Sequence, residues 1–243
     1  MTRIAYDAAD AEAFEATRHL NDDGLSAWRT ALTRHLDPHP GARILDLGAG
    51  TGSWARSFTT WFPGVQVVAV EPSEAMRARS VFHPVLAGDA AHIPLHDASV
   101  DAAWISTVIH HVPDLNAAAH EVRRVLRPGA PVLIRSAFAG RHHAITLFRY
   151  FPEAIRVLDT YPGVADVEAA FATAGFVATS LEQVPQVTAA SLQQAATTLR
   201  RQAHTPLQLI TDDEYALGLT RLRAAAKTRS GPVIDALDLL VLR

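Results

Sequence analysis

Between residues 42 and 138, short apolar runs alternate with segments of helical periodicity. Apolar runs cover residues 42–47, 65–70, 84–89, 100–106 and 131–138, and helical spacing marks 53–62, 73–80 and 115–126. Runs rich in Val and Ile that alternate with helices of about ten residues are typical of βαβ units and a parallel sheet. Because such crossovers are right-handed, the pattern predicts a doubly wound α/β fold with helices on both faces of the sheet.

The two ends of the chain have a looser pattern. Residues 10–36 have helical spacing that is interrupted near residues 21–24, and Pro38 and Pro40 end that helix. Beyond residue 138 we expect a helical segment at 142–163, a helix at 164–176 that ends at Gly175, and a strand at 176–184. Helices at 191–201 and 212–229 and a final strand at 235–243 complete the prediction.

Composition limits the classes of function. The chain has 243 residues, a formal net charge of −3 and no cysteine. The length suits one large domain, and the missing cysteines exclude disulfides, thiolate zinc sites and a cysteine nucleophile. We expect no nucleic-acid partner because no long basic run is present. With neither a signal-peptide pattern nor an apolar run of about 20 residues, we expect no membrane contact and a cytoplasmic location.

A glycine-rich stretch, ILDLGAGTGSWA at 44–55, follows the first predicted strand. Gly48, Gly50 and Gly52 would let the main chain pass close beneath a ligand, and a bare turn rarely needs three glycines. The dinucleotide fingerprint fails when it is counted from Gly48, and it is met only weakly by Gly50, Gly52 and Ala55. The spacing alone therefore does not identify the ligand.

Asp46 lies two residues before the first glycine, and its charge bears on the ligand. A carboxylate 4 Å from a phosphate charge is unfavourable by about 1 kcal/mol even in water-like surroundings. A cationic ligand reverses the sign of this interaction. S-adenosylmethionine carries a sulfonium and an ammonium group and no phosphate, so it suits an acid at this position.

Four motifs in order resemble the class I S-adenosylmethionine-dependent methyltransferases. They are ILDLGAGTG, VVAVEPSEAM, LAGDAAHIPLHDASVDAAWISTVIHHV and EVRRVLRPGAPVLI, and the likeness runs from about residue 42 to residue 136. It is strongest to the subgroup that methylates small molecules, which includes enzymes of quinone biosynthesis. The chain departs from the family pattern at Ala130, where a second glycine is usual, and at Val100, where phenylalanine is usual.

The resemblance implies a fold and a division of the chain. The fold would be a Rossmann-like, mostly parallel seven-stranded sheet with N-terminal helices and a helical elaboration after strand five. Within one domain over 1–243, residues 1–40 would form a helical cap, 42–138 the cofactor-binding core, 139–232 the substrate and lid helices with strand six, and 233–243 the final strand. The protein would be a monomer or a homodimer acting on a small molecule.

The resemblance also implies the residues that hold S-adenosylmethionine. Glu71 would accept hydrogen bonds from the ribose hydroxyls, Met76 would cover one adenine face, and Asp89 would accept from the adenine amine while the Ala90 NH meets the ring. Ser106 would line the methionine portion. The full predicted cofactor set is Asp46, Gly48, Ala49, Gly50, Gly52, Glu71, Pro72, Met76, Asp89, Ala90, Ser106 and His111.

Histidines supply the candidate catalytic groups. His110 and His111 follow the fourth strand, where one of them could act as a base on the acceptor or could only shape the loop. A metal site that uses them with Asp114 is disfavoured because adjacent histidines seldom converge on one ion. Substrate contacts are expected from Tyr6, His142 and His143, and the aromatic segment 148–151 could close over the acceptor or form an ordinary amphipathic helix.

Three alternatives to a small-molecule methyltransferase remain open from the sequence. A nicotinamide-dependent oxidoreductase could share the architecture, and a non-catalytic protein could bind S-adenosylmethionine without turning it over. An enzyme that modifies a macromolecule would need a basic surface stripe. The acceptor, and whether its oxygen, nitrogen or carbon is methylated, is left undetermined.

Overall fold

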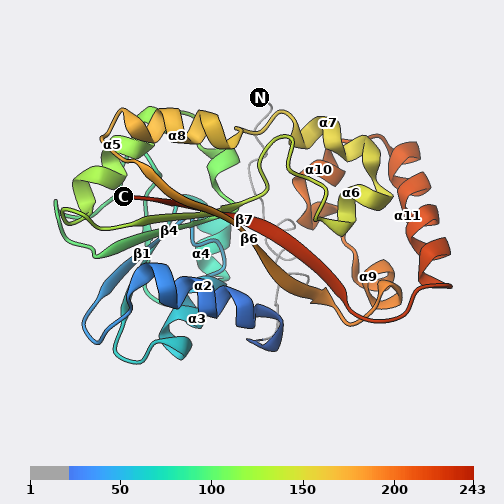
Figure 1. The fold of residues 1–243 in the computed structure, drawn as a ribbon, viewed down its shortest axis with the longest axis horizontal. Helices are drawn as coiled ribbons and strands as arrows, with labels where there is room; N and C mark the ends of the chain where they lie inside the picture. Colours follow the sequence, from blue (N-terminus) through green and yellow to red (C-terminus); the bar gives the residue numbers. More distant parts are fainter. Residues whose placement is uncertain (1–21) are drawn as a thin grey trace.

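A seven-stranded sheet forms the centre of the structure, a computed structural model that describes residues 22–243 (Figure 1). Its order is β3-β2-β1-β4-β5-β7-β6. The strands are β1 (Arg43–Leu47), β2 (Gln66–Glu71), β3 (Val85–Ala87), β4 (Ala102–Ser106), β5 (Val132–Ser136), β6 (Ala178–Ala189) and β7 (Val233–Leu242). Strands β1 to β5 pair in parallel, and β7 runs antiparallel to both β5 and β6. The predicted mostly parallel, seven-stranded α/β fold is confirmed.

Helices cover both faces of the sheet, as predicted. In Figure 1, α2 (Ser26–Leu36) and α3 (Ser53–Trp61) lie on one side, and α5 (Leu115–Val125) and α8 (Val164–Ala172) lie on the other. Consecutive strand residues point to opposite faces. Accordingly, Ile44 packs in the core beneath α2 and α3, whereas Leu45 packs in the core beneath α5 and α8.

A second group of helices lies beside the sheet, and we call it the helical part. It contains α6 (Thr146–Tyr150), α7 (Ile155–Leu158), α9 (Leu192–Thr198), α10 (Thr205–Gln208) and α11 (Asp212–Ala226). These helices share their own apolar core, to which Phe151, Leu158 and Leu222 belong. The long β6–β7 ribbon reaches from the sheet to this part (Figure 1), so the two regions meet along one continuous ladder.

Short elements complete the fold and fix the ends of several helices. They are α4 (Glu74–Ala78), η1 (Asp22–Leu25), η2 (Ile109–His111), η3 (Pro152–Ala154) and η4 (Arg201–Ala203). Ser73 caps α4 by accepting from the Met76 NH at 3.3 Å. Gly175 has a φ of +79° shortly after α8, which is the left-handed position expected of a glycine there.

Two predicted segments differ from the structure. The segment 142–163 is not one helix, because Pro152 begins a separate turn and divides it into α6, η3 and α7. Strands β6 and β7 pair as far as Ala189 and Val233, and β6 ends five residues beyond its predicted limit. Most residues of β6 are exposed or half-buried, which weakens the apolar signal that would mark its end. The part of the predicted 10–36 helix before residue 22 lies outside the described residues.

No helix within residues 22–243 is long and apolar enough to cross a membrane.

Candidate functional site

A large cavity opens where the parallel strands end and continues into the helical part. Its volume is about 1420 Å³, and its walls come from the loops after β1, β2, β4 and β5, from the β6–β7 ribbon and from α6, α9 and α11. Crevices at the carboxyl ends of parallel strands are the usual ligand sites of such sheets. The volume exceeds the roughly 300–1,000 Å³ of a typical single-ligand pocket, so the cavity has room for two molecules.

The glycine loop after β1 forms the first wall. Gly48, Gly50 and Gly52 have φ values of +73°, +56° and +77°, which favour glycine. A Cβ on Gly48 would lie 2.4 Å from Val108, and one on Gly52 would lie 2.4 Å from the Ser80 hydroxyl. A Cβ on Gly50 would meet no atom of residues 22–243 within 4 Å, and this residue lines the cavity. The three glycines therefore pack the loop closely and leave its ligand side bare.

Two carboxylates lie at this loop. Glu71, at the end of β2, accepts from the Gly50 NH through Oε2 at 2.9 Å and from the Ser73 NH through Oε1 at 2.8 Å. Asp46 is 1 % exposed, and its Oδ2 has no hydrogen-bond partner in the part of the chain that the structure describes. Burial, with a further contribution from the charge of Glu71, raises the pKa of Asp46 to about 7. Burial also raises the pKa of Glu71, against the backbone hydrogen bonds that lower it.

These shifts describe a site that is short of positive charge. Each raised pKa means that the carboxylate form is costly where it lies. A cation placed beside the loop would relieve that cost, whereas a phosphate would increase it. The orphaned oxygen of Asp46 and the bare face of Gly50 therefore fit a cationic ligand, as the sequence suggested for S-adenosylmethionine.

The predicted cofactor residues divide between the cavity wall and its surroundings. Gly48, Ala49, Gly50, Glu71, Pro72, Met76, Ser106 and His111 line the cavity. Asp46 lies in β1 and Gly52 lies immediately before α3, and neither is among the lining residues. Asp89 and Ala90 also lie outside the lining, where the exposed Asp89 accepts from the Ala91 NH at 2.8 Å.

The predicted catalytic pair lies on the cavity wall. His110 and His111 form η2 directly beyond β4, and their rings lie 4.0 Å apart. The His110 ring also stacks on Tyr161, with 4.1 Å between centroids and 8° between planes. His110 therefore contacts Tyr161, which packs against the core of the helical part.

The histidines predicted to contact the substrate lie away from the wall of the large cavity. His142 and His143 do not line the large cavity, and His143 lines a smaller hollow with Arg141. Tyr6 lies outside the described residues. In the segment 148–151, Phe148, Tyr150 and Phe151 line the cavity, and Phe148 also packs in the helical core.

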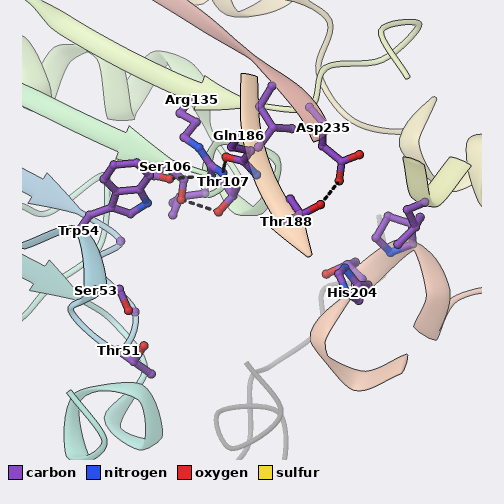
Figure 2. A pocket seen from close by; sticks show the side chains of 18 of the residues that line it. Thr51, Ser53, Trp54, Ser106, Thr107, Arg135, Gln186, Thr188, His204 and Asp235 are labelled. Carbon is purple, nitrogen blue, oxygen red and sulfur yellow. Dashed lines mark hydrogen bonds between the residues drawn. The ribbon is translucent and has the colours of Figure 1, made fainter. Parts of the chain in front are cut away.

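Several lining residues are missing from the sequence prediction. Figure 2 shows Arg135 of β5 with Ser106 and Thr107 on one side and Gln186 of β6 on the other. Thr188, His204 and Asp235 line the wall that leads into the helical part. Arg135 is the one with a visible sequence signal, since it is a single charged residue inside the apolar run 131–138.

The described residues contain no group of three or more His, Asp or Glu side chains placed to hold a metal ion.

Known proteins share this fold and sequence pattern. Residues 45–134 match the family described as "Methyltransferase domain". The chain is 36 % identical over 126 residues to a demethylmenaquinone methyltransferase of Corynebacterium kroppenstedtii, covering 50 % of this chain and 53 % of that protein. It is 32 % identical over 174 residues to a malonyl-[acyl-carrier protein] O-methyltransferase of Dechloromonas aromatica, covering 65 % and 66 %.

A solved structure extends the likeness over nearly the whole chain. A phosphoethanolamine N-methyltransferase 2 of Haemonchus contortus, in complex with phosphomonomethylethanolamine and S-adenosylhomocysteine, superposes with a TM-score of 0.61 at 19 % identity. The match covers 98 % of this chain and 57 % of that one. The matched region is 41 % to 66 % of the length of the first curated relatives. Residues 45–134 therefore form a methyltransferase domain, and the strand order and glycine loop of the chain are similar to those of the class I S-adenosylmethionine-dependent methyltransferases.

Proposed function

We propose that this protein transfers the methyl group of S-adenosylmethionine to a small-molecule acceptor. The observation that carries the proposal is the loop after β1, where a bare glycine surface lies beside two carboxylates whose pKa values are raised. When bound, S-adenosylmethionine supplies a methyl group on a sulfonium, which leaves a neutral thioether after displacement. The acceptor forms its bond to the methyl carbon as the sulfur–carbon bond breaks.

The chain's own residues bind and orient in this proposal. The loop Gly48–Gly50 takes the methionine end, with Asp46 beneath it as the negative charge. Glu71 uses its remaining lone pairs for the ribose hydroxyls, since each carboxylate oxygen accepts more than one hydrogen bond. Met76, which is 4 % exposed and lines the cavity, covers the adenine. Asp89 and Ala90 belong to the proposed adenine site, although neither residue lines the cavity in this structure.

The remainder of the cavity takes the acceptor. Positioning two reactants in line can contribute about 7–11 kcal/mol of barrier reduction, so no nucleophilic side chain is required. His110 or His111 accepts the acceptor's proton where the acceptor is a hydroxyl or an ammonium group. Residues 139–232 act as the substrate and lid region, because α6, α9 and α11 supply the second half of the wall.

Methyl transfer is tested with methyl-labelled S-adenosylmethionine and a panel of small hydroxyl, amine and carbon acceptors. We expect label in one acceptor class with an equal amount of S-adenosylhomocysteine. Binding of S-adenosylmethionine without release of S-adenosylhomocysteine for any acceptor would support the non-catalytic alternative. The oxidoreductase alternative predicts instead that NAD raises the melting temperature, by the equivalent of about 2.7 kcal/mol at 100 times its Kd.

A further inference from the structure

The β6–β7 ribbon turns one of its faces toward the cavity. Successive strand residues point to opposite sides. On β7, Val233, Asp235 and Leu237 line the cavity, whereas the intervening Ile234 is 57 % exposed. Thr188 of β6 lies beside Asp235 in the same wall (Figure 2). Among the described residues of this ribbon, Asp235 is therefore the only acid that lines the cavity.

Two neutral donors fix the position of the Asp235 carboxylate. Its Oδ1 accepts from the Thr146 NH at 2.7 Å, at the start of α6. Its Oδ2 accepts from the Thr188 hydroxyl at 3.1 Å. Because a carboxylate has about four lone-pair sites, roughly two of them remain for a ligand. The carboxylate is thus held on the wall by bonds that bring no positive charge to it.

No ion pair joins Asp235 to a cationic side chain of residues 22–243. Arg135 donates at 2.7 Å to Gln186, the residue paired with Asp235 across the ribbon, and at 3.2 Å to Ser106. His204 lines the same wall from the turn between η4 and α10. A ligand cation would give the Asp235 carboxylate the positive partner that these neighbours do not provide, through short, charge-assisted hydrogen bonds.

The wall around Asp235 is apolar. Val233 and Leu237 flank it along β7, and Ile145 and Leu147 lie on either side of the residue that donates to its Oδ1. All four line the cavity, whose wall continues into the apolar core of the helical part. Hydrocarbon buried against this wall is favourable in proportion to its area, and a hydrogen bond strengthens where water is scarce. The site thus combines one fixed acid with hydrophobic surroundings.

We propose that Asp235 is a substrate-binding residue that selects acceptors in which a protonated amine is carried on an apolar body. The ammonium group donates to the remaining lone pairs of the carboxylate, and the body lies along the apolar wall. The assignment of this ligand as the methyl acceptor rests on the proposed function, whereas the ammonium site itself is tested by binding alone.

The test compares three probes with the same eight-carbon body: octylamine, octanol and octanoate. An alkylamine, like the lysine side chain with its pKa of about 10.4, is a cation at pH 8. The Kd values are measured on the full chain at pH 8 by titration calorimetry, with and without saturating S-adenosylhomocysteine, which covers the acids of the glycine loop. We expect octylamine to bind about tenfold or more tightly than octanol, as charge-assisted hydrogen bonds predict, and octanoate to bind most weakly.

Matched variants separate Asp235 from a general effect of charge. Asp235→Asn removes the charge but keeps the shape and an oxygen for the Thr146 NH, and it should bring the amine-to-alcohol affinity ratio to about 1. Asp213→Asn removes the same charge from an exposed position of α11 outside the cavity lining, and it should keep the wild-type ratio. Asp235→Ser takes the place of Asp235→Asn, with the same expected ratio, if the asparagine variant does not fold.

Octanol or octanoate binding to wild type as tightly as octylamine would overturn the inference, and so would failure of all three probes to bind. An amine preference that survives in Asp235→Asn would overturn it as well, because other acids of the cavity would then be responsible. S-adenosylhomocysteine binding in the same samples separates the two proposals. Its absence beside an amine preference that depends on Asp235 contradicts the methyltransferase function alone, and its presence without such a preference contradicts the ammonium site alone.

Discussion

Glu71 reaches from the end of β2 to the loop after β1, where its Oε2 accepts from the Gly50 NH at 2.9 Å. Its other oxygen accepts from the Ser73 NH at 2.8 Å, at the start of α4. One carboxylate therefore ties together two of the segments that surround the proposed nucleoside. It holds the loop in place, and in the proposed function it also binds the ribose hydroxyls.

Replacing Glu71 with glutamine should weaken S-adenosylmethionine binding. Glutamine has only one acceptor oxygen, so its NH₂ group would face one of the two backbone NH groups. We expect the Kd for S-adenosylmethionine to rise by about tenfold or more, since hydrogen bonds to charged groups contribute about 1.5–3 kcal/mol. Titration calorimetry measures it. Glu168→Gln on α8, outside the cavity, is the control, and an equal loss in both variants would show that the effect is not local.

Asp46 should make the stability of the protein depend on pH. Its pKa in the folded protein is about 7, against the ordinary aspartate value of 3.8, so between these pH values the folded state holds a proton that the unfolded state has lost. Between about pH 4 and pH 7, stability therefore falls as pH rises, and above that window the penalty is constant.

Asp46→Asn removes this titration. The melting temperature of the variant minus that of wild type should increase from pH 5 to pH 8 and then level off. The increase should be about 5 °C or more, given roughly 1.4 kcal/mol for each of the two pH units below the pKa of about 7 and about 2–4 °C per kcal/mol for a chain of this size. Thermal unfolding at several pH values measures it. A difference that is flat with pH would show that Asp46 has an ordinary pKa.

Gly48 should tolerate no side chain because of Val108. A Cβ there would lie 2.4 Å from a Val108 methyl carbon, in addition to the strain of a φ of +73°. Gly48→Ala should lower the melting temperature and weaken S-adenosylmethionine binding, and Val108→Ala in the same chain should restore part of both. Gly129→Ala is the matched control, because its φ is +78° but no atom of the described part of the chain lies within 4 Å of the new Cβ. Equal losses in Gly48→Ala and Gly129→Ala would mean that backbone strain alone is responsible.

Gly218 should influence the acceptor end of the cavity. It lies in α11, where a Cβ would come within 2.1 Å of the Phe151 ring, and Phe151 lines the cavity. Gly218→Ala should displace that ring and raise the KM of the acceptor several-fold, while the Kd for S-adenosylmethionine stays near its wild-type value. Steady-state kinetics and calorimetry separate the two constants. Leu217→Ala, at a 48 % exposed neighbouring position, serves as control, and a raised Kd for S-adenosylmethionine in Gly218→Ala would contradict this assignment.

The part of the site that follows local sequence rules could be predicted. Gly48, Gly50 and Glu71 lie directly at the ends of parallel strands, and such ends meet at one edge of the sheet whatever the rest of the chain does. The same reasoning placed Ser106, His110 and His111 on the cavity wall. For these residues, the order of the sequence motifs was sufficient to predict a position on the cavity wall.

The acceptor side depends on tertiary packing that the sequence pattern does not contain. Gln186 meets Arg135 only because β7 inserts between β5 and β6 and because the β6–β7 ribbon extends past the sheet. His142 and His143 were expected at the site because they follow β5. The chain turns first at Gly140, with a φ of +72°, and Arg141 pairs with the buried Asp238 at 2.7 Å, which directs this segment along the ribbon instead.

The most direct test of the central claim is the affinity of the wild-type protein for S-adenosylmethionine and for NADH at pH 6 and pH 8. S-adenosylmethionine has a net positive charge near neutral pH, so it favours the ionised form of Asp46. We predict that it binds, that it binds more tightly at pH 8 than at pH 6, and that NADH does not compete. Binding of NADH in preference to S-adenosylmethionine, or no binding of S-adenosylmethionine at either pH, would contradict a site built for a cationic nucleoside.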